Sequence, residues 1–134
     1  MRQLLLMVSV AAISVTLLAQ DEKDYQTWMK TIGATVGSLR KNLEAKNSDA
    51  AASDAKKLQE TFTQVHDFWM EKKTEDAMKF AANAQNGFKE IAELASAGNF
   101  EEAQATLKTT MSNCAGCHNA HRVKGDDGSY KIKY

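Results

Sequence analysis

Hydrophobic residues recur at alternating steps of three and four along most of this chain, which is the spacing of one face of a helix. From residue 22 onward, four such amphipathic segments follow one another with short polar breaks and no proline. Their predicted bounds are about 22–46, 49–72, 74–98 and 99 to beyond His118. Ser48 or Asp49 is the expected cap of the second helix, and Asn99 with Glu102 has the spacing of a capping box.

Four amphipathic helices with short connections predict an all-α protein, an antiparallel up-down-up-down four-helix bundle. In that topology the first and third helices begin, and the second and fourth helices end, at the same end of the bundle. Most of the bulky aromatic residues should gather there: Tyr25, Trp28, Phe68, Trp69 and Phe80. Only the tail from residue 125 to 134 carries a weak strand pattern.

The chain opens with an apolar run from Leu4 to Ala19 that follows Arg2 and ends where charged residues begin. This pattern is typical of a secretory signal peptide, and the run is shorter than the ~20 apolar residues of a spanning helix; a retained anchor is the alternative. We expect a signal peptide at 1–19, the bundle domain at 20–124 and a tail at 125–134. The protein is then periplasmic, with no stable membrane insertion after cleavage.

The charge balance limits the classes of partner. Lysine and arginine number 17, and aspartate and glutamate also number 17. Nucleic acids and anionic membranes both favour a strongly basic face. We therefore expect neither as the main partner.

The last predicted helix carries the only two cysteines of the chain in a CxxCH motif: Cys114, Cys117 and His118. This spacing is typical of covalent haem c, in which each thiol joins one vinyl group and the histidine binds the iron. A thioredoxin-like use is disfavoured because no strand precedes Cys114. A zinc site with His121 as fourth ligand is disfavoured because adjacent Cys117 and His118 are hard to place around one ion.

The bundle topology nominates Met29 as the second axial ligand. Met29 lies about 10 Å into the first helix at 1.5 Å per residue, and His118 lies about one turn before the end of the fourth. The two positions therefore have similar heights on neighbouring antiparallel helices. Trp28, Trp69 and Phe80 are the expected apolar walls of the haem site. The alternative is that Met29 and these aromatics are ordinary core.

The segments 25–33 and 114–122 together resemble the class II c-type cytochromes, the cytochrome c-prime superfamily. The resemblance implies a four-helix bundle with haem at one end, and a methionine matching Met29 implies the low-spin branch with two axial ligands. Arg122 matches the family's basic position near the haem. Tyr25 stands where members commonly carry arginine, and His121 stands where an aromatic residue is usual. The resemblance also implies a homodimer.

These observations predict a soluble monohaem electron carrier that exchanges electrons with redox partner proteins. No catalytic acid, base or nucleophile stands out, so a carrier is expected rather than an enzyme. The alternative function is a five-coordinate, c-prime-like protein that binds nitric oxide or carbon monoxide. A haem-free metal or redox module ranks third.

Overall fold

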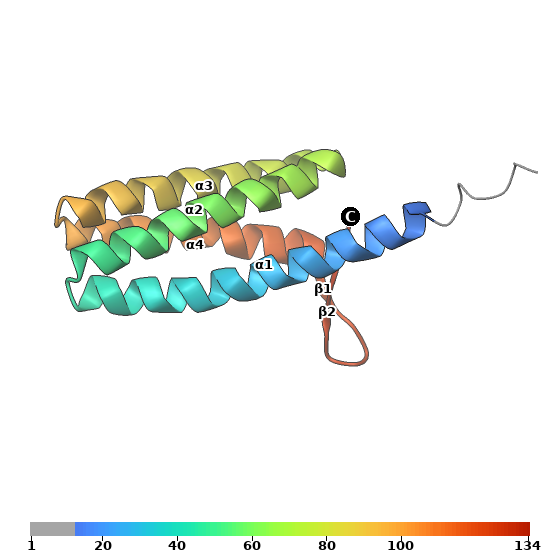
Figure 1. Ribbon diagram of the computed structural model, residues 1–134, viewed down its shortest axis with the longest axis horizontal. Coiled ribbons are helices and arrows are strands. Elements are labelled where there is room, and N and C mark those ends of the chain that lie inside the picture. The colour runs from blue at the N-terminus through green and yellow to red at the C-terminus, as the bar shows by residue number, and fades with distance from the viewer. Residues whose placement is uncertain (1–12) are drawn as a thin grey trace, which may run out of the picture.

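Four helices form nearly all of the protein in a computed structural model that describes residues 13–134, with backbone alone for 13–21. Their bounds are Ile13–Glu44 (α1), Ser48–Glu71 (α2), Glu75–Ser96 (α3) and Phe100–His121 (α4). Figure 1 shows consecutive helices side by side and running in opposite directions. The predicted all-α four-helix bundle is confirmed.

The first helix begins earlier than the hydrophobic pattern predicts, at Ile13 instead of residue 22. Most of the predicted signal peptide lies outside the described residues, and its cleavage stays a prediction. No helix in the described part of the chain combines the length and the apolar character needed to cross a membrane.

The three helix connections share one backbone design. In each, the helix is followed by a residue with positive φ, which is Lys46, Lys73 or Gly98. The amide of that residue and the amide of the next residue donate hydrogen bonds to carbonyls in the last turns of the helix, as in a Schellman motif. These tight turns keep consecutive helices adjacent and antiparallel. They also place the start of α1 and the end of α4 at the same end of the bundle (Figure 1).

The predicted cap of the second helix is wrong, and that of the fourth helix, Asn99, is confirmed in position but not in its capping hydrogen bond. The cap of α2 is Asn47, whose side-chain oxygen accepts a hydrogen bond from the amide of Ala50 at 3.2 Å. Ser48 is instead the first helical residue, and its hydroxyl donates to the carbonyl of Ala95 at the end of α3. Asn99 precedes α4 but its side chain makes no capping hydrogen bond, so the predicted capping box does not form.

The core follows the predicted helical faces. Its largest fully buried side chains come from α1, α2 and α3: Leu39, Leu43, Leu58, Trp69, Phe88 and Ile91. Three buried threonines donate their hydroxyl groups to backbone carbonyls one turn earlier: Thr35, Thr61 and Thr110. Within the described residues no buried side-chain polar atom lacks a partner.

The helices pack unevenly around this core. α2 and α3 lie together along their whole length and α3 packs closely on α4, whereas α1 and α4 touch at few points. The α3–α4 contact is tight because Gly87 faces Thr110: a Cβ atom on Gly87 would lie 2.1 Å from the Thr110 hydroxyl oxygen. The few contacts between α1 and α4 leave an open seam between these two helices.

The chain ends in a two-stranded antiparallel hairpin, β1 (Arg122–Lys124) and β2 (Tyr130–Ile132), which points sideways from the bundle (Figure 1). In its register Val123 pairs with Lys131. Asp127 stabilises the turn by accepting hydrogen bonds from the amide and the hydroxyl of Ser129. The weak strand pattern of the tail therefore becomes a strand only by pairing with residues directly after α4.

We expect the substitution Gly87→Ala to lower the free energy of unfolding by about 1–3 kcal/mol, because the added methyl group has to displace the buried Thr110 side chain. The matched control is Gly37→Ala in α1, where a Cβ atom meets nothing within 4 Å. This control should gain about 0.5–1 kcal/mol from helix propensity. Urea denaturation of the two variants measures the difference, and equal stabilities would contradict the tight α3–α4 contact.

Candidate functional site

A cavity of about 540 Å³ opens along the seam between α1 and α4. Its volume lies within the ~300–1,000 Å³ typical of small-molecule and cofactor sites. All four helices and the hairpin contribute to its wall, which is mainly apolar. The sparse contact between α1 and α4 leaves this space.

The CxxCH residues lie on the last turns of α4 and face this cavity. Residues three and four apart share one side of a helix, so Cys114, Cys117 and His118 point the same way. All three are half-buried, and both cysteines have free thiols. Gly116 lets α4 approach α3 here, since a Cβ atom on it would lie 2.7 Å from the ring of Phe80.

Burial sets the protonation of these groups. It raises the pKa of Cys114, and it raises the pKa of Cys117 from 9.0 to about 11, with smaller contributions from Cys114 and Asp76. Burial also lowers the pKa of His118, and the positive charge of Arg122 adds to this effect. The site thus holds protonated thiols and a neutral imidazole at pH 7, and neutral imidazole is the form that binds metals.

The opposite wall belongs to α1, where Met29, Gly33 and Gly37 recur at every fourth position and line the cavity. A Cβ atom on either glycine would meet nothing within 4 Å. The two glycines therefore leave a flat, open stretch of helix directly after the Met29 side chain. Bulkier side chains at these positions would fill part of the cavity.

The charged residues of the cavity wall all have the same sign. Among the described residues that line it, the permanently charged side chains are Lys30, Arg40, Arg122 and Lys131, and no carboxylate accompanies them. Arg122 also lies over the ring of Tyr130, 4.1 Å from its centroid. A largely apolar space edged by cations suits a flat apolar ligand that carries negative charge at its rim.

The structure brings six of the eight residues predicted for the site to the cavity wall: Met29, Phe80, Cys114, Cys117, His118 and Arg122. Trp28 and Trp69 are placed differently and are not among the lining residues. Trp69 is fully buried, and Trp28 meets Tyr25 edge-on with ring centroids 6.3 Å apart. The predicted contact of these two tryptophans with a cofactor stays a prediction.

The predicted gathering of aromatic residues at this end does occur. The ring of Tyr25 lies 4.5 Å from that of Phe68 and 5.7 Å from that of Trp69, and the Trp69 indole N–H donates to the Tyr25 hydroxyl at 3.0 Å. Burial is the main cause that raises the pKa of Tyr25, so its hydroxyl stays neutral. Of these three residues, Tyr25 lines the cavity, and Phe68 and Trp69 pack behind it.

His121 ties three segments together at the edge of the cavity. Its Nε2 lies 2.9 Å from a carboxylate oxygen of Asp76 at the start of α3, and its Nδ1 lies 2.8 Å from the carbonyl oxygen of Lys133. Both partners are acceptors, so both hydrogen bonds form together only when the ring carries two protons. The bond from His121 is the main cause that lowers the pKa of Asp76.

Sequence reasoning placed Arg122 at the site but missed the other three cations of the cavity wall, Lys30, Arg40 and Lys131, and the two glycines. The glycines had a signal, because Gly33 and Gly37 continue the four-residue spacing from Met29. Lys131 had none, since the hairpin alone brings it to the cavity. In the described part of the chain no three His, Cys, Asp or Glu side chains form a group that could hold a metal ion, so the zinc alternative gains no support.

No protein-family model, curated protein or solved structure matches the chain.

In the protein with both thiols free, we expect alkylation of Cys117 by iodoacetamide to reach half its maximal rate near pH 11, because only the thiolate reacts and burial disfavours it. Peptide mass spectrometry across a pH series measures this rate. A solvent-exposed control cysteine, Lys124→Cys, should reach half-rate near its ordinary pKa of about 8.5. Identical pH profiles for Cys117 and this control would contradict the burial of the thiol.

Proposed function

We propose that this protein is a monohaem c-type cytochrome of the class II type that carries electrons between partner proteins. Cys114 and Cys117 would hold the haem covalently, and the His118 imidazole and the Met29 thioether would bind its iron. One observation carries the proposal: the seam cavity has the CxxCH residues on its α4 wall and Met29 on its α1 wall. The sequence motif alone does not require that arrangement.

The cationic rim and the flat α1 wall support the same ligand. Haem is a flat apolar ring with two propionate groups, which are negatively charged at pH 7. Gly33 and Gly37 leave room for a flat ring against α1. Arg122 and Lys131 from the hairpin side, with Lys30 and Arg40 from α1, could neutralise the propionates.

When bound, haem iron accepts and releases one electron. The chain would contribute the neutral imidazole of His118 and the thioether of Met29. A methionine ligand raises the reduction potential of haem iron. The helices would limit rearrangement of the site during electron transfer, because α4 packs closely on α3 at Gly87 and Gly116. The mainly apolar wall would limit the access of water to a ligand bound in the cavity. The predicted signal peptide would bring the chain to the periplasm, where haem c attachment takes place.

The Met29 ligand can be tested by absorption spectroscopy of the purified, haem-loaded protein. We expect a low-spin ferrous spectrum from the wild type and a high-spin spectrum, with new carbon monoxide binding, from Met29→Ala. The matched control is Met111→Ala, because Met111 lines the same cavity from the α4 side. It should keep the low-spin spectrum.

Two outcomes would overturn the proposal in different ways. A high-spin wild type that binds nitric oxide or carbon monoxide would replace electron transfer with gas binding. Loss of the haem during acid-acetone extraction would exclude covalent attachment through Cys114 and Cys117 and remove both haem functions.

The open wall of α1 yields a second test. We expect Gly33→Leu to leave the haem-free bundle as stable as the wild type or more stable by up to about 0.8 kcal/mol, because leucine favours helix over glycine. The same variant should incorporate much less haem, since its side chain enters the cavity. Gly33→Ala should give an intermediate yield. Thermal unfolding followed by circular dichroism and the haem-to-protein absorbance ratio measure both effects, and full haem incorporation by Gly33→Leu would contradict the proposed position of the ring.

A further inference from the structure

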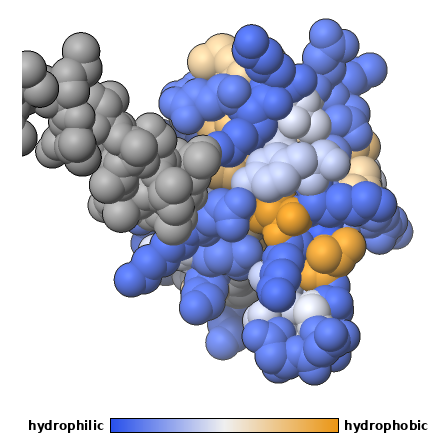
Figure 2. Space-filling view, turned by 90° about the vertical axis from the view of Figure 1, so that its right-hand side faces the viewer, coloured by the Kyte–Doolittle hydropathy of each residue, from blue (hydrophilic) through white to orange (hydrophobic). Residues whose placement is uncertain are grey.

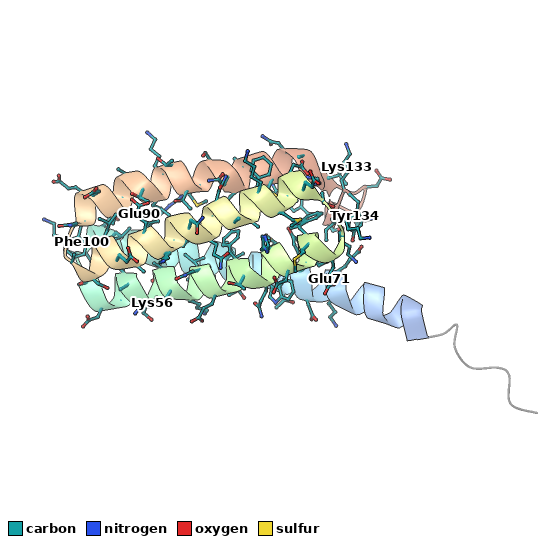
Figure 3. The ribbon with its side chains drawn as sticks, turned by 90° about the horizontal axis from the view of Figure 1, so that it is seen from above. Lys56, Glu71, Glu90, Phe100, Lys133 and Tyr134 are labelled. Atoms are coloured by element: carbon teal, nitrogen blue, oxygen red, sulfur yellow. The ribbon has the colours of Figure 1, made fainter. Side chains whose placement is uncertain are left out.

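Exposed apolar side chains concentrate at the end of the bundle that holds the CxxCH motif. Among the side chains that the structure describes, the exposed large hydrophobics are Met70, Val123, Tyr130 and Tyr134, with 42–57% of their surface accessible. Figure 2 looks onto this end and shows hydrophobic side chains within a mostly hydrophilic surface. Figure 3 places Tyr134 and Lys133 at this end, beside Glu71 of α2 and far from Phe100 at the start of α4.

The hairpin surrounds its exposed apolar residues with positive charge. Its strands and the residue after them carry Arg122, Lys124, Lys131 and Lys133 and no carboxylate. The acidic residues Asp126 and Asp127 lie in the turn, where Asp127 is already bonded to Ser129. Because paired residues of an antiparallel ladder share one face, the register places Arg122, Lys124 and Tyr130 on one face of the hairpin and Val123 and Lys131 on the other. The exposed apolar residues and the cations therefore lie on both faces of a narrow ribbon. We call the set Arg122, Val123, Lys124, Tyr130, Lys131 and Lys133 the hairpin patch.

The hairpin patch is held in a fixed position. The amide of Lys133 donates to the carbonyl of His121 at 2.8 Å, and the carbonyl of Lys133 is bonded to the His121 ring. Gln26 of α1 donates to the carbonyl of Tyr130 at 3.4 Å. A surface ordered before binding loses less entropy when a partner docks.

We infer that the hairpin patch is the docking surface for an acidic patch on a redox partner protein. The inference rests on the proposed function, because three residues of the hairpin patch also line the cavity: Arg122, Tyr130 and Lys131. A partner that docks here therefore approaches the cofactor cavity directly. Charge complementarity identifies the partner's surface as acidic, although the whole chain has balanced charge.

The size and composition of the hairpin patch fit a brief encounter between proteins. Two exposed apolar side chains among four cations provide little area for a permanent interface, and weak electron-transfer complexes bury less than about 1,200 Å². Local positive charge instead raises the association rate with an acidic surface. An anionic membrane is the alternative binding partner of the hairpin patch, and phosphatidylglycerol vesicles test for it.

Charge reversal on the hairpin tests the inference with small redox probes. The reduced, haem-loaded protein gives one electron to hexacyanoferrate(III), which becomes hexacyanoferrate(II), or to the cationic tris(phenanthroline)cobalt(III). At low salt the double variant Lys124→Glu/Lys133→Glu should slow the anionic probe by about threefold or more and speed the cationic probe. The control Lys56→Glu/Lys89→Glu, on the α2–α3 side of the bundle, carries the same charge change and should alter neither rate by more than about 1.5-fold. Equal effects of the two double variants would overturn the docking surface.

A polymer and a vesicle probe distinguish a protein partner from a membrane. We expect poly-L-glutamate to shift amide NMR signals of residues 122–133 in the haem-loaded wild type, less so in Val123→Ser, and not in Lys124→Glu/Lys133→Glu. No shift at the hairpin, or co-sedimentation with phosphatidylglycerol vesicles at physiological salt without such shifts, would overturn the protein partner.

Failure of the inference is distinguishable from failure of the proposed function. A purified protein without covalent haem overturns the function, and the electron-transfer role of the hairpin patch with it. A haem-loaded protein whose hairpin variants behave like the Lys56/Lys89 control keeps the function and overturns the hairpin patch alone.

Discussion

A helix in a four-helix bundle usually buries its inner face against two neighbours, but here the inner face of α1 packs mainly on α2. The seam that remains toward α4 costs the protein apolar burial, because the space along it is lined largely by hydrophobic atoms. Met29 and the two glycines of α1 lie on one side of the seam, and the CxxCH residues lie on the other. Each feature of the candidate site follows from this one gap in the packing.

The opposite side of α4 shows why the gap can keep its shape. There, Gly87 and Gly116 allow close contacts with Thr110 and Phe80, and a Cβ atom at either position would require these side chains to shift. α2, α3 and α4 consequently form a compact unit that holds the cysteines and His118 in place, and α1 is added to it chiefly through α2. Tight packing on one side and sparse packing on the other are complementary requirements of a bundle that keeps room for a ligand.

The sequence predicts the parts of this structure that depend on local periodicity. Four helical faces, the shared end of the bundle and the presence of both Met29 and His118 on the wall of one cavity all follow from residue spacing. Asn47 replaces the predicted caps of α2 because Ser48 is engaged by the end of α3, a contact that is distant in sequence. Lys131 and the His121–Asp76 pair are unpredictable for the same reason. Lys131 joins the cations of α1 at the cavity only once the hairpin has folded against the bundle.

The hairpin also bridges the seam at its open end. Gln26 reaches the carbonyl of Tyr130 from α1, and the Tyr134 hydroxyl donates to Glu22. β1 follows α4 directly and pairs with β2, so these two hydrogen bonds connect α1 to the end of α4 across the sparse seam. The hairpin thus supplies, at the end that holds the cavity, a link between α1 and α4 that the helices themselves provide at few points.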